Sequence, residues 1–211
     1  MRKPLLGVLV ALLVVSSGCV GLITGETVAF ESSPTSVDDS VLESTGYELT
    51  NSTEQNVTRT VQFAGQERTI RVVNHVDQYR RGIDFGPLGT VQLSRFVVVS
   101  TPNAEVAGQS LNPAAQWSNR EVVARVASRA GGVRDIQFEG NRTTQSLGES
   151  REVSTFSGTM TTFGQEIDVR MHAASFEHEG DVIIVFAVHP DEIDEQARVD
   201  TMLRGLEHEG N

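Results

Sequence analysis

The sequence predicts an α+β domain, with a central antiparallel sheet of about six to eight strands and two or three helices packed on it. Most of the chain after residue 46 alternates apolar and polar residues and is rich in Thr and Val, as half-buried strands are. Two runs, 96–99 and 182–189, are apolar on both faces, which is typical of central strands. Amphipathic helical patterns after each run supply the covering layer.

The first elements form a short strand and a short helix. We predict a strand over 27–31 and a helix over 37–45, with Ser36 as the N-cap, Asp39 at the third position of a capping box and Gly46 as the stop. The apolar stripe of this helix consists of Val37, Val41 and Leu42.

The next part of the chain is predicted to be strand-rich. Gly82, Gly86 and Pro87 indicate a loop over 80–88, and Pro102 ends the last strand before a loop over 103–113. Strands are predicted over 47–53, 57–63, 69–79 and 91–100.

A capping box formed by Ser118 and Glu121 opens the second helix, and Gly131-Gly132 ends it. Its apolar stripe consists of Val122, Val123, Val126, Ala127 and Ala130. Strands follow over 133–138, 151–157, 166–176 and 182–189.

After Pro190, a run of acidic residues indicates the N-terminus of a last helix, because the helix dipole favours negative charge there. These residues are Asp191, Glu192, Asp194 and Glu195, and the expected buried stripe is Val199, Met202, Leu203 and Leu206.

The two halves of the chain share a short internal sequence similarity. Gly65-Gln66-Glu67 and Arg71 recur as Gly164-Gln165-Glu166 and Arg170. Each copy is followed by an apolar strand, a proline and a helix. Two β-β-β-α repeats, 47–130 and 133–208, would explain this order, and chance similarity of turn sequences is the open alternative.

The N-terminus has the features of a lipoprotein export signal. Arg2-Lys3 precedes an apolar run over 5–15, which is shorter than the ~20 residues of a membrane span. Cys19 follows small residues, as in a lipobox, although Ser16 occupies the place where bacterial lipoboxes carry Leu. We predict a signal peptide over 1–18, lipidation of Cys19, a tether over 19–35 and a single domain over 36–211. A cleaved signal without lipidation and a short uncleaved anchor remain open, as does the export route.

The composition indicates a halophilic host and excludes general nucleic-acid binding. The 211 residues carry 17 basic and 28 acidic side chains, for a net charge of −11, and Lys3 is the only lysine. Acidic surfaces tolerate high salt because salt screens their repulsion, whereas nucleic-acid binding needs surplus positive charge. Arginine-rich coding is a second explanation for the missing lysines.

Two resemblances extend this interpretation. The order of strands and terminal helix over 151–207 resembles the fold of the photosystem protein PsbP and of related mycobacterial lipoproteins. The whole chain is similar to an uncharacterised family of haloarchaeal lipoproteins through Ser17-Gly18-Cys19, Thr45-Gly46-Tyr47 and the segment 176–190. The second resemblance implies a lipid-anchored surface protein and no activity.

Familiar catalytic motifs are absent from the sequence. There is no Gly-x-Ser-x-Gly nucleophile elbow, no phosphate loop and no HExxH spacing, so no cofactor is predicted. The only weak candidates for a metal site are Glu177, His178, Glu179 and Asp181, and an acidic hairpin turn is the favoured explanation for them. His172 shares a strand face with Asp168 and Arg170, which predicts a solvent-facing histidine.

Arginines around the second helix are the candidates for anion binding. They are Arg120, Arg125, Arg129 and Arg134, and Arg125 and Arg129 are spaced i, i+4 on one helix face. Either carboxylates of the domain neutralise them, or they bind a lipid head group, a sulfated glycan or an acidic partner.

Three sequons mark candidate glycosylation sites at Asn51, Asn56 and Asn141, of which Asn141 has the best loop context. These features favour a non-enzymatic, lipid-anchored protein on the extracellular side of the cell membrane, which binds another envelope protein or an anionic surface component. The alternative is an extracytoplasmic hydrolase, or a small-ligand or metal-binding protein, with an unrecognised site.

Overall fold

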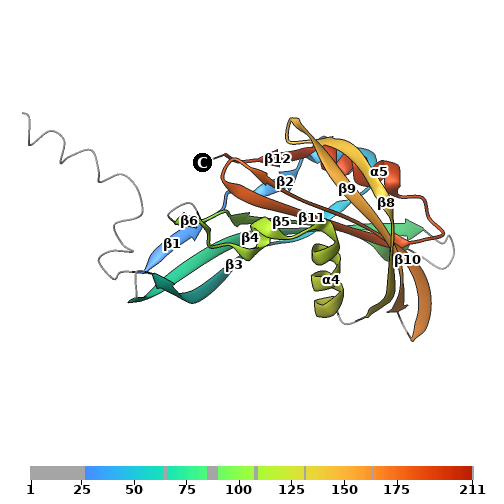
Figure 1. Ribbon diagram of the computed structural model, residues 1–211. Helices are drawn as coiled ribbons and strands as arrows, with labels where there is room; N and C mark the ends of the chain where they lie inside the picture. The colour runs from blue at the N-terminus through green and yellow to red at the C-terminus, as the bar shows by residue number, and fades with distance from the viewer. Residues whose placement is uncertain are drawn as a thin grey trace, which may run out of the picture.

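A computed structural model of the chain describes residues 27–63, 66–84, 90–106, 109–130, 132–162 and 164–210 (Figure 1). The predicted signal peptide over 1–18 and Cys19 lie outside the described residues.

One large sheet dominates the fold and confirms the predicted α+β class. Its strand order is β1-β4-β5-β11-β10-β9-β8, and β3 pairs with β4. All pairings are antiparallel except that of β1 with β4, which makes the sheet mixed. Its strands are β1 (Val28–Glu31), β3 (Glu48–Phe63), β4 (Gln66–Asp84), β5 (Thr90–Pro102), β8 (Val133–Ser146), β9 (Glu149–Thr162), β10 (Gln165–His178) and β11 (Asp181–Pro190).

The remaining elements are short. Strand β2 (Thr35–Val37) pairs with β12 (Leu206–His208), and β6 (Glu105–Val106) pairs with β7 (Gln109–Ser110). The helices are α3 (Asp39–Thr45), a 3₁₀ turn over Pro113–Gln116, α4 (Asn119–Ala130) and α5 (Gln196–Arg204).

The two apolar runs lie side by side at the centre of the sheet. Strands β5 and β11 pair antiparallel, with Val98 opposite Val185. Every residue of β11 except Val188 is buried. The prediction of two central strands is therefore confirmed, because residues buried on both faces have no polar side to alternate with.

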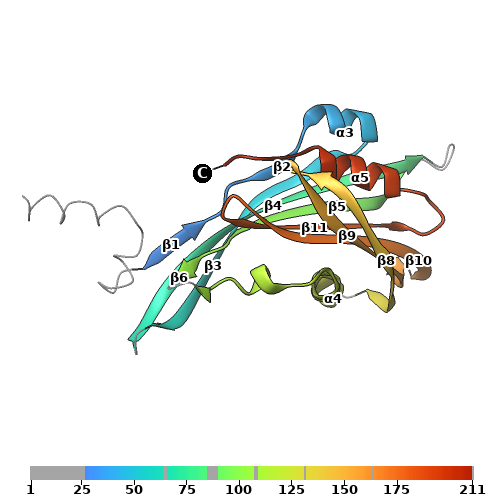
Figure 2. The same ribbon diagram turned by 45° about the horizontal axis from the view of Figure 1, so that its top comes forward.

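Helices cover both faces of the sheet (Figure 2). On one face α4 packs against Phe156, Met171 and Phe186 through Val122 and Val123. On the other face α3 and α5 enclose a second core, which contains Tyr47, Tyr79, Phe96, Ile183, Val199, Met202 and Leu203. The stripe predicted for the last helix is buried as expected.

Several predicted element boundaries are wrong. The strands over 47–53 and 57–63 are one continuous strand, β3, with a bulge between Leu49 and Asn51. The loop predicted from residue 80 is strand as far as Asp84, and β8 runs eight residues beyond 138, to Ser146. Where such a strand begins and ends depends on the neighbouring strand with which it pairs, so local turn residues do not reveal these boundaries.

Helix α3 begins later than predicted. Asp38, not Ser36, is its N-cap, because the Asp38 carboxylate accepts from the backbone N–H groups of Ser40 and Val41. Gly46 ends the helix with φ at 73°, as predicted for a left-handed C-cap.

The two halves occupy related places in the sheet. Strands β3-β4-β5 and β9-β10-β11 each form a meander, and the two meanders meet where β5 pairs with β11. Helices α4 and α5, however, cover opposite faces of the sheet (Figure 2). The duplication itself stays a prediction.

Candidate ligand-binding site

A pocket of about 310 Å³ lies between α4 and the surface of β3, β4 and β5. Strand alternation builds its floor, because Val57 and Arg59 of β3 lie opposite Val72 and Ile70 of β4 and point to the same face. Trp117 and the α4 residues Val122 and Val126 line its other wall, and the remaining lining comes mainly from the loop over 102–114. Valines and isoleucine make both walls largely apolar, and polar side chains from the sheet and from α4 are interspersed among them.

Local capping fixes the helix that bears the pocket wall. The Ser118 N–H donates to Glu121 Oε2 at 2.9 Å, and the Glu121 N–H donates to Ser118 Oγ at 3.3 Å. This is the predicted capping box, and α4 begins directly after it. The Ser118 hydrogen bonds, with a smaller contribution from Arg125, lower the pKa of the Glu121 carboxyl.

The four arginines predicted to bind an anion have three different surroundings in the structure. Arg125 and Arg129 line the pocket, and the Arg125 guanidinium lies 4.2 Å from the centroid of the Trp117 ring. Arg120 instead lies over the rings of Phe138 and Phe156. Arg134 forms an ion pair with Glu166, so it is neutralised within the domain.

Arg125 and Arg129 have no carboxylate within 4 Å among the residues that the structure describes. Arg59 of β3 is also in the pocket lining and is equally without such a partner in the described ranges. The sequence analysis missed Arg59. Its alternation with Gln55 and Val57 on one strand face was the available signal, but nothing in the sequence places β3 opposite α4.

Asn74 adds an unsatisfied polar group to the pocket. Its side-chain oxygen is buried and has no hydrogen-bond partner in the described structure, although the residue lines the pocket. A buried amide atom without a partner costs free energy that a ligand group would recover.

Among the residues that the structure describes, the pocket lining has no group suited to proton transfer. Its ionisable members in the described ranges are Arg59, Arg125 and Arg129, and no Asp, Glu, His, Cys, Lys, Ser or Tyr is found among them. General acid–base catalysis needs a group that titrates near the working pH, and arginine does not. The arrangement can bind and orient an anion, but these residues cannot move a proton.

The candidate metal loop does not converge on one point. Asp181 is 2% exposed and accepts a 2.7 Å hydrogen bond from the Ser33 N–H. Burial raises the pKa of the Asp181 carboxyl, and the Ser33 hydrogen bond opposes that rise. The His178 ring packs edge-on against His208, while Glu177 and Glu179 are exposed.

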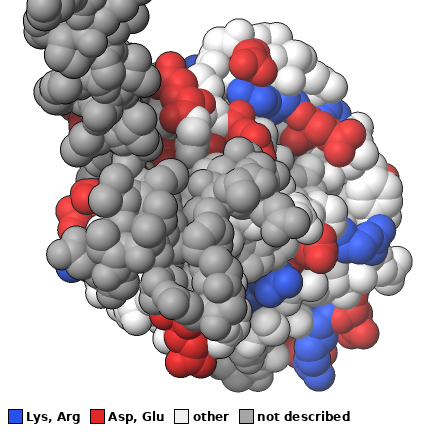
Figure 3. Space-filling model, turned by 60° about the vertical axis from the view of Figure 1, so that its left-hand side comes forward, with Lys and Arg blue, Asp and Glu red and all other residues white. Residues whose placement is uncertain are grey.

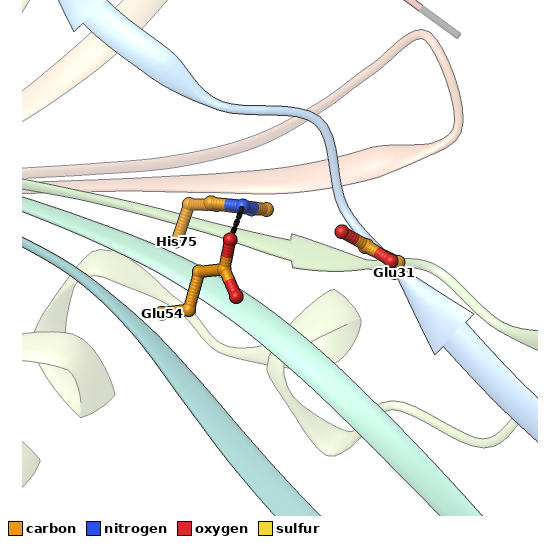
Figure 4. A group of neighbouring side chains, drawn as sticks. All are labelled: Glu31, Glu54 and His75. Atoms are coloured by element: carbon orange, nitrogen blue, oxygen red, sulfur yellow. Dashed lines mark ion pairs between the residues drawn. The ribbon is translucent and has the colours of Figure 1, made fainter.

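A different cluster of potential metal ligands lies where β1, β3 and β4 meet (Figure 4). One ligand atom each of Glu31, Glu54 and His75 lies within 4.8 Å of the other two. His75 Nε2 is 3.6 Å from Glu54 Oε1, and His75 Nδ1 is 3.2 Å from Ser32 Oγ. Sequence analysis could not find this cluster, because its three residues are 21 or more positions apart.

The Ser32–His75–Glu54 connectivity has the composition of a hydrolase triad but not its function. Ser32 is 2% exposed, and its hydroxyl lies 2.9 Å from the Ser100 carbonyl and 3.3 Å from the Val73 carbonyl. A nucleophile must be open to the substrate and must pass its proton to the base. Ser32 is instead a structural donor between strands.

The sequons lie on strands. Asn51 and Asn56 are exposed residues of β3, with no turn between them. Asn141 is exposed but belongs to β8, where its Oδ1 accepts from Ser154 Oγ at 2.8 Å, so the loop predicted there is wrong. Exposure keeps all three as glycosylation candidates.

The charged side chains on one described face are mixed. In Figure 3 acidic and basic residues are interspersed and do not gather into one basic area on the part of this face that the structure describes. None of the described helices is long and apolar enough to cross a membrane.

The sequence pattern of the family described as "Domain of unknown function (DUF6517)" matches residues 34–207. No curated protein matches the chain. Among solved structures, PA94 of Pseudomonas aeruginosa, a protein of unknown function, has 11% identity and a TM-score of 0.30, covering 64% of this chain and 84% of that chain. LpqN, involved in cell envelope biogenesis of Mycobacterium tuberculosis, has 9% identity and a TM-score of 0.34, covering 83% of this chain and 98% of that chain.

Proposed function

Because the chain belongs to the family described as "Domain of unknown function (DUF6517)", which names no activity, we propose its function from the pocket. The protein is a non-enzymatic binding domain, and the pocket between α4 and the sheet takes an amphiphile with an anionic head group. The domain acts on the extracellular side of the cell membrane of a halophilic archaeon, to which lipid on Cys19 anchors it.

Two kinds of wall support an amphiphilic ligand. The valines and isoleucine of the sheet floor and the valines of α4 supply apolar surface, and a pocket of about 310 Å³ is at the lower end of the about 300–1,000 Å³ usual for small-molecule sites. Arg125 and Arg129 then supply donors in a fork that fits a carboxylate or a phosphate.

The observation that carries the proposal is the pair Arg125 and Arg129, held one helical turn apart without a carboxylate partner in the described part of the chain. Like charges at i, i+4 destabilise a helix by ~0.2–0.5 kcal/mol. An anion bound between them removes this repulsion and makes charge-assisted hydrogen bonds. Because the pocket wall beside them is apolar, a ligand with an apolar body gains from burial as well.

The position of the proposed anchor is compatible with this function. The lipobox-like segment ends at Cys19, only nine residues before β1 begins at Val28. A domain tethered at this distance stays near the membrane surface, where anionic amphiphiles are concentrated.

Trp117 provides a direct assay, because it is the only tryptophan of the chain and it lines the pocket. We would titrate the full-length protein with decyl phosphate, with uncharged decyl maltoside and with inorganic phosphate, all below micelle-forming concentrations. We expect a saturable change in tryptophan emission with decyl phosphate, and binding at least tenfold weaker with the other two probes.

Arg125→Gln and Arg129→Gln are each expected to weaken decyl phosphate binding at least tenfold. Arg71→Gln is the matched control, since Arg71 is an exposed arginine of β4 outside the pocket lining. Equal affinity of wild type and both pocket variants would contradict the proposal. Binding of a polyglutamate peptide without any binding of decyl phosphate would replace the amphiphile with an acidic protein partner.

A further inference from the structure

The cluster of Glu31, Glu54 and His75 brings three strands together on the sheet face opposite the pocket. Glu54 and His75 are direct cross-strand partners on β3 and β4, so their side chains point the same way. Glu31 is the partner of Val73, two residues from His75 on β4, and therefore also shares this face. Figure 4 shows the three side chains turned toward one another.

The hydrogen bonds of Ser32 fix the tautomer of His75. The Ser32 hydroxyl has one proton, and its nearest acceptor is the Ser100 carbonyl at 2.9 Å, with the Val73 carbonyl at 3.3 Å. Ser32 Oγ therefore accepts from His75, and the Nδ1 of that ring carries the hydrogen at 3.2 Å. In the neutral ring, Nε2 then has no hydrogen and carries a free lone pair.

This lone pair faces acceptors only. Nε2 of His75 points at Glu54 Oε1 across 3.6 Å, and a carboxylate oxygen of Glu31 lies within 4.8 Å of both. No hydrogen-bond donor lies among the three atoms in the described part of the chain. Three lone-pair donors that converge in this way are the arrangement that a cation satisfies.

We propose that Glu31, Glu54 and His75 bind one divalent first-row transition-metal ion, such as Zn²⁺ or Mn²⁺, through one imidazole nitrogen and two carboxylates. The imidazole favours these ions over Ca²⁺ and Mg²⁺, which prefer oxygen ligands alone. Ser32 holds the ring through its other nitrogen, as the outer partners of metal-bound histidines do. Water completes the coordination on the exposed side.

The ion would fasten β1 to the domain. Strand β1 pairs with β4 over four residues only, and it is the first described element after the N-terminal segment. An ion that links Glu31 on β1 to β3 and β4 adds a connection at the end of this pairing. The site thereby controls how firmly β1 is held against β4.

Isothermal titration of the full-length, chelator-treated protein with Zn²⁺ and with Mn²⁺ tests the site. We expect one ion per chain, and at least tenfold weaker binding in Glu54→Gln and in His75→Gln. Glu54→Gln keeps the test valid if His75→Gln fails to fold, because the Glu54 side chain is 61% exposed. Glu48→Gln, an exposed residue of the same strand outside the cluster, is the matched control and is expected to bind as wild type does.

Hydrogen exchange tests the link to β1 separately. The ion is expected to slow exchange of the backbone amides over Val28–Glu31 in wild type and in Glu48→Gln, but not in Glu54→Gln. Absence of binding by either ion, or equal affinity in wild type, Glu54→Gln and His75→Gln, would overturn the site. Binding without slower exchange in β1 would overturn the fastening role.

Discussion

His172 and His189 form a buried, hydrogen-bonded pair beneath α5. The His189 Nδ1–H donates to the Pro190 carbonyl at 2.8 Å, so His189 Nε2 accepts from His172 Nε2–H at 3.1 Å. His172 Nδ1 then accepts from Arg142 at 3.0 Å. Burial, and next the Arg142 charge, lower the pKa of His172 to about 2, and burial also lowers that of His189. Both rings are therefore neutral in the folded protein.

Folding stability should fall as the pH falls below the ordinary histidine pKa of ~6.5. In the unfolded chain His172 takes up a proton there, while in the folded chain it does not until about pH 2. The stability it contributes is complete above ~6.5 and declines below it by up to about 1.4 kcal/mol per pH unit. Urea unfolding between pH 7.5 and 5 should show a shallower decline in His172→Asn than in wild type. Parallel pH profiles of the two proteins would contradict this account.

Strand alternation assigned His172 to the correct face but not to the correct environment. Asp168, Arg170 and His172 do share one side of β10, and their burial rises along the strand from exposed to fully buried. The prediction of a solvent-facing His172 is wrong, because the Arg142 side chain covers this part of β10. Arg142 in turn pairs with Asp200 of α5. Strand alternation predicts which face of the sheet a side chain lies on. Whether that side chain is buried depends on an element that lies elsewhere in the sequence.

At the scale of elements, α5 is held at both ends. Glu195, its N-cap, is fully buried and accepts from Arg81 of β4 at 2.7 Å and from Arg198 at 3.1 Å. The sequence predicted acidic residues at this helix start for the dipole, yet α5 begins only at Gln196. Glu195 instead forms the ion pair that joins the helix to the sheet.

The other end of α5 approaches α3 closely at Gly205. A Cβ added there would lie 2.5 Å from Val41 Cγ2, while the backbone φ of −91° is open to any residue. Gly205→Ala should therefore destabilise the protein by about 1–3 kcal/mol through overpacking alone.

Chemical denaturation would measure this loss. Gly140→Ala is the matched control, because nothing lies within 4 Å of its Cβ position. Adding Val41→Ala to Gly205→Ala should recover part of the stability. A Gly205→Ala protein as stable as wild type would show that α3 and α5 do not pack as described.

Local signals predicted the helices better than the strands. Ser118 with Glu121 and the glycine at 46 mark helix ends through bonds made within a few residues. The extension of β8 over 139–146 depends instead on its register with β9, where Thr143 lies opposite Glu152. The pocket residues also divide into those that local signals predicted and those that they did not. Arg125 and Arg129 were found from helix spacing, but Arg59 and Asn74 join them only in three dimensions.

At the scale of the whole molecule, the family of unknown function predicted from the sequence is confirmed. The halophilic host, the lipid anchor and the PsbP-like likeness of the C-terminal half stay predictions.

The net charge of −11 predicts that folding depends on salt. Repulsion among carboxylates is screened within about 3 Å at 1 M salt but reaches about 10 Å at 0.1 M. The melting temperature should therefore fall when KCl is lowered from multimolar concentrations to ~0.1 M. A melting temperature that stays constant over this range would contradict the halophilic interpretation.

Replacing Cys19 tests the anchor. Cys19→Ser should release the protein into the medium or leave an uncleaved precursor, because no thiol then remains to carry lipid. Fractionation of cells into membrane and medium measures this, with wild type as the control. Equal retention of both proteins in the membrane would exclude lipidation as the anchor.

Photo-crosslinking tests whether the pocket beside α4 binds an anionic amphiphile. A decyl phosphate that carries a diazirine in its chain is irradiated with the full-length protein, and the labelled peptides are mapped by mass spectrometry. We expect labels on the walls of the pocket, around Leu111, Trp117 and Val126. These labels should be lost in the double variant Arg125→Gln/Arg129→Gln but not in Arg71→Gln. Labels spread over the surface, or unchanged in the double variant, would contradict it.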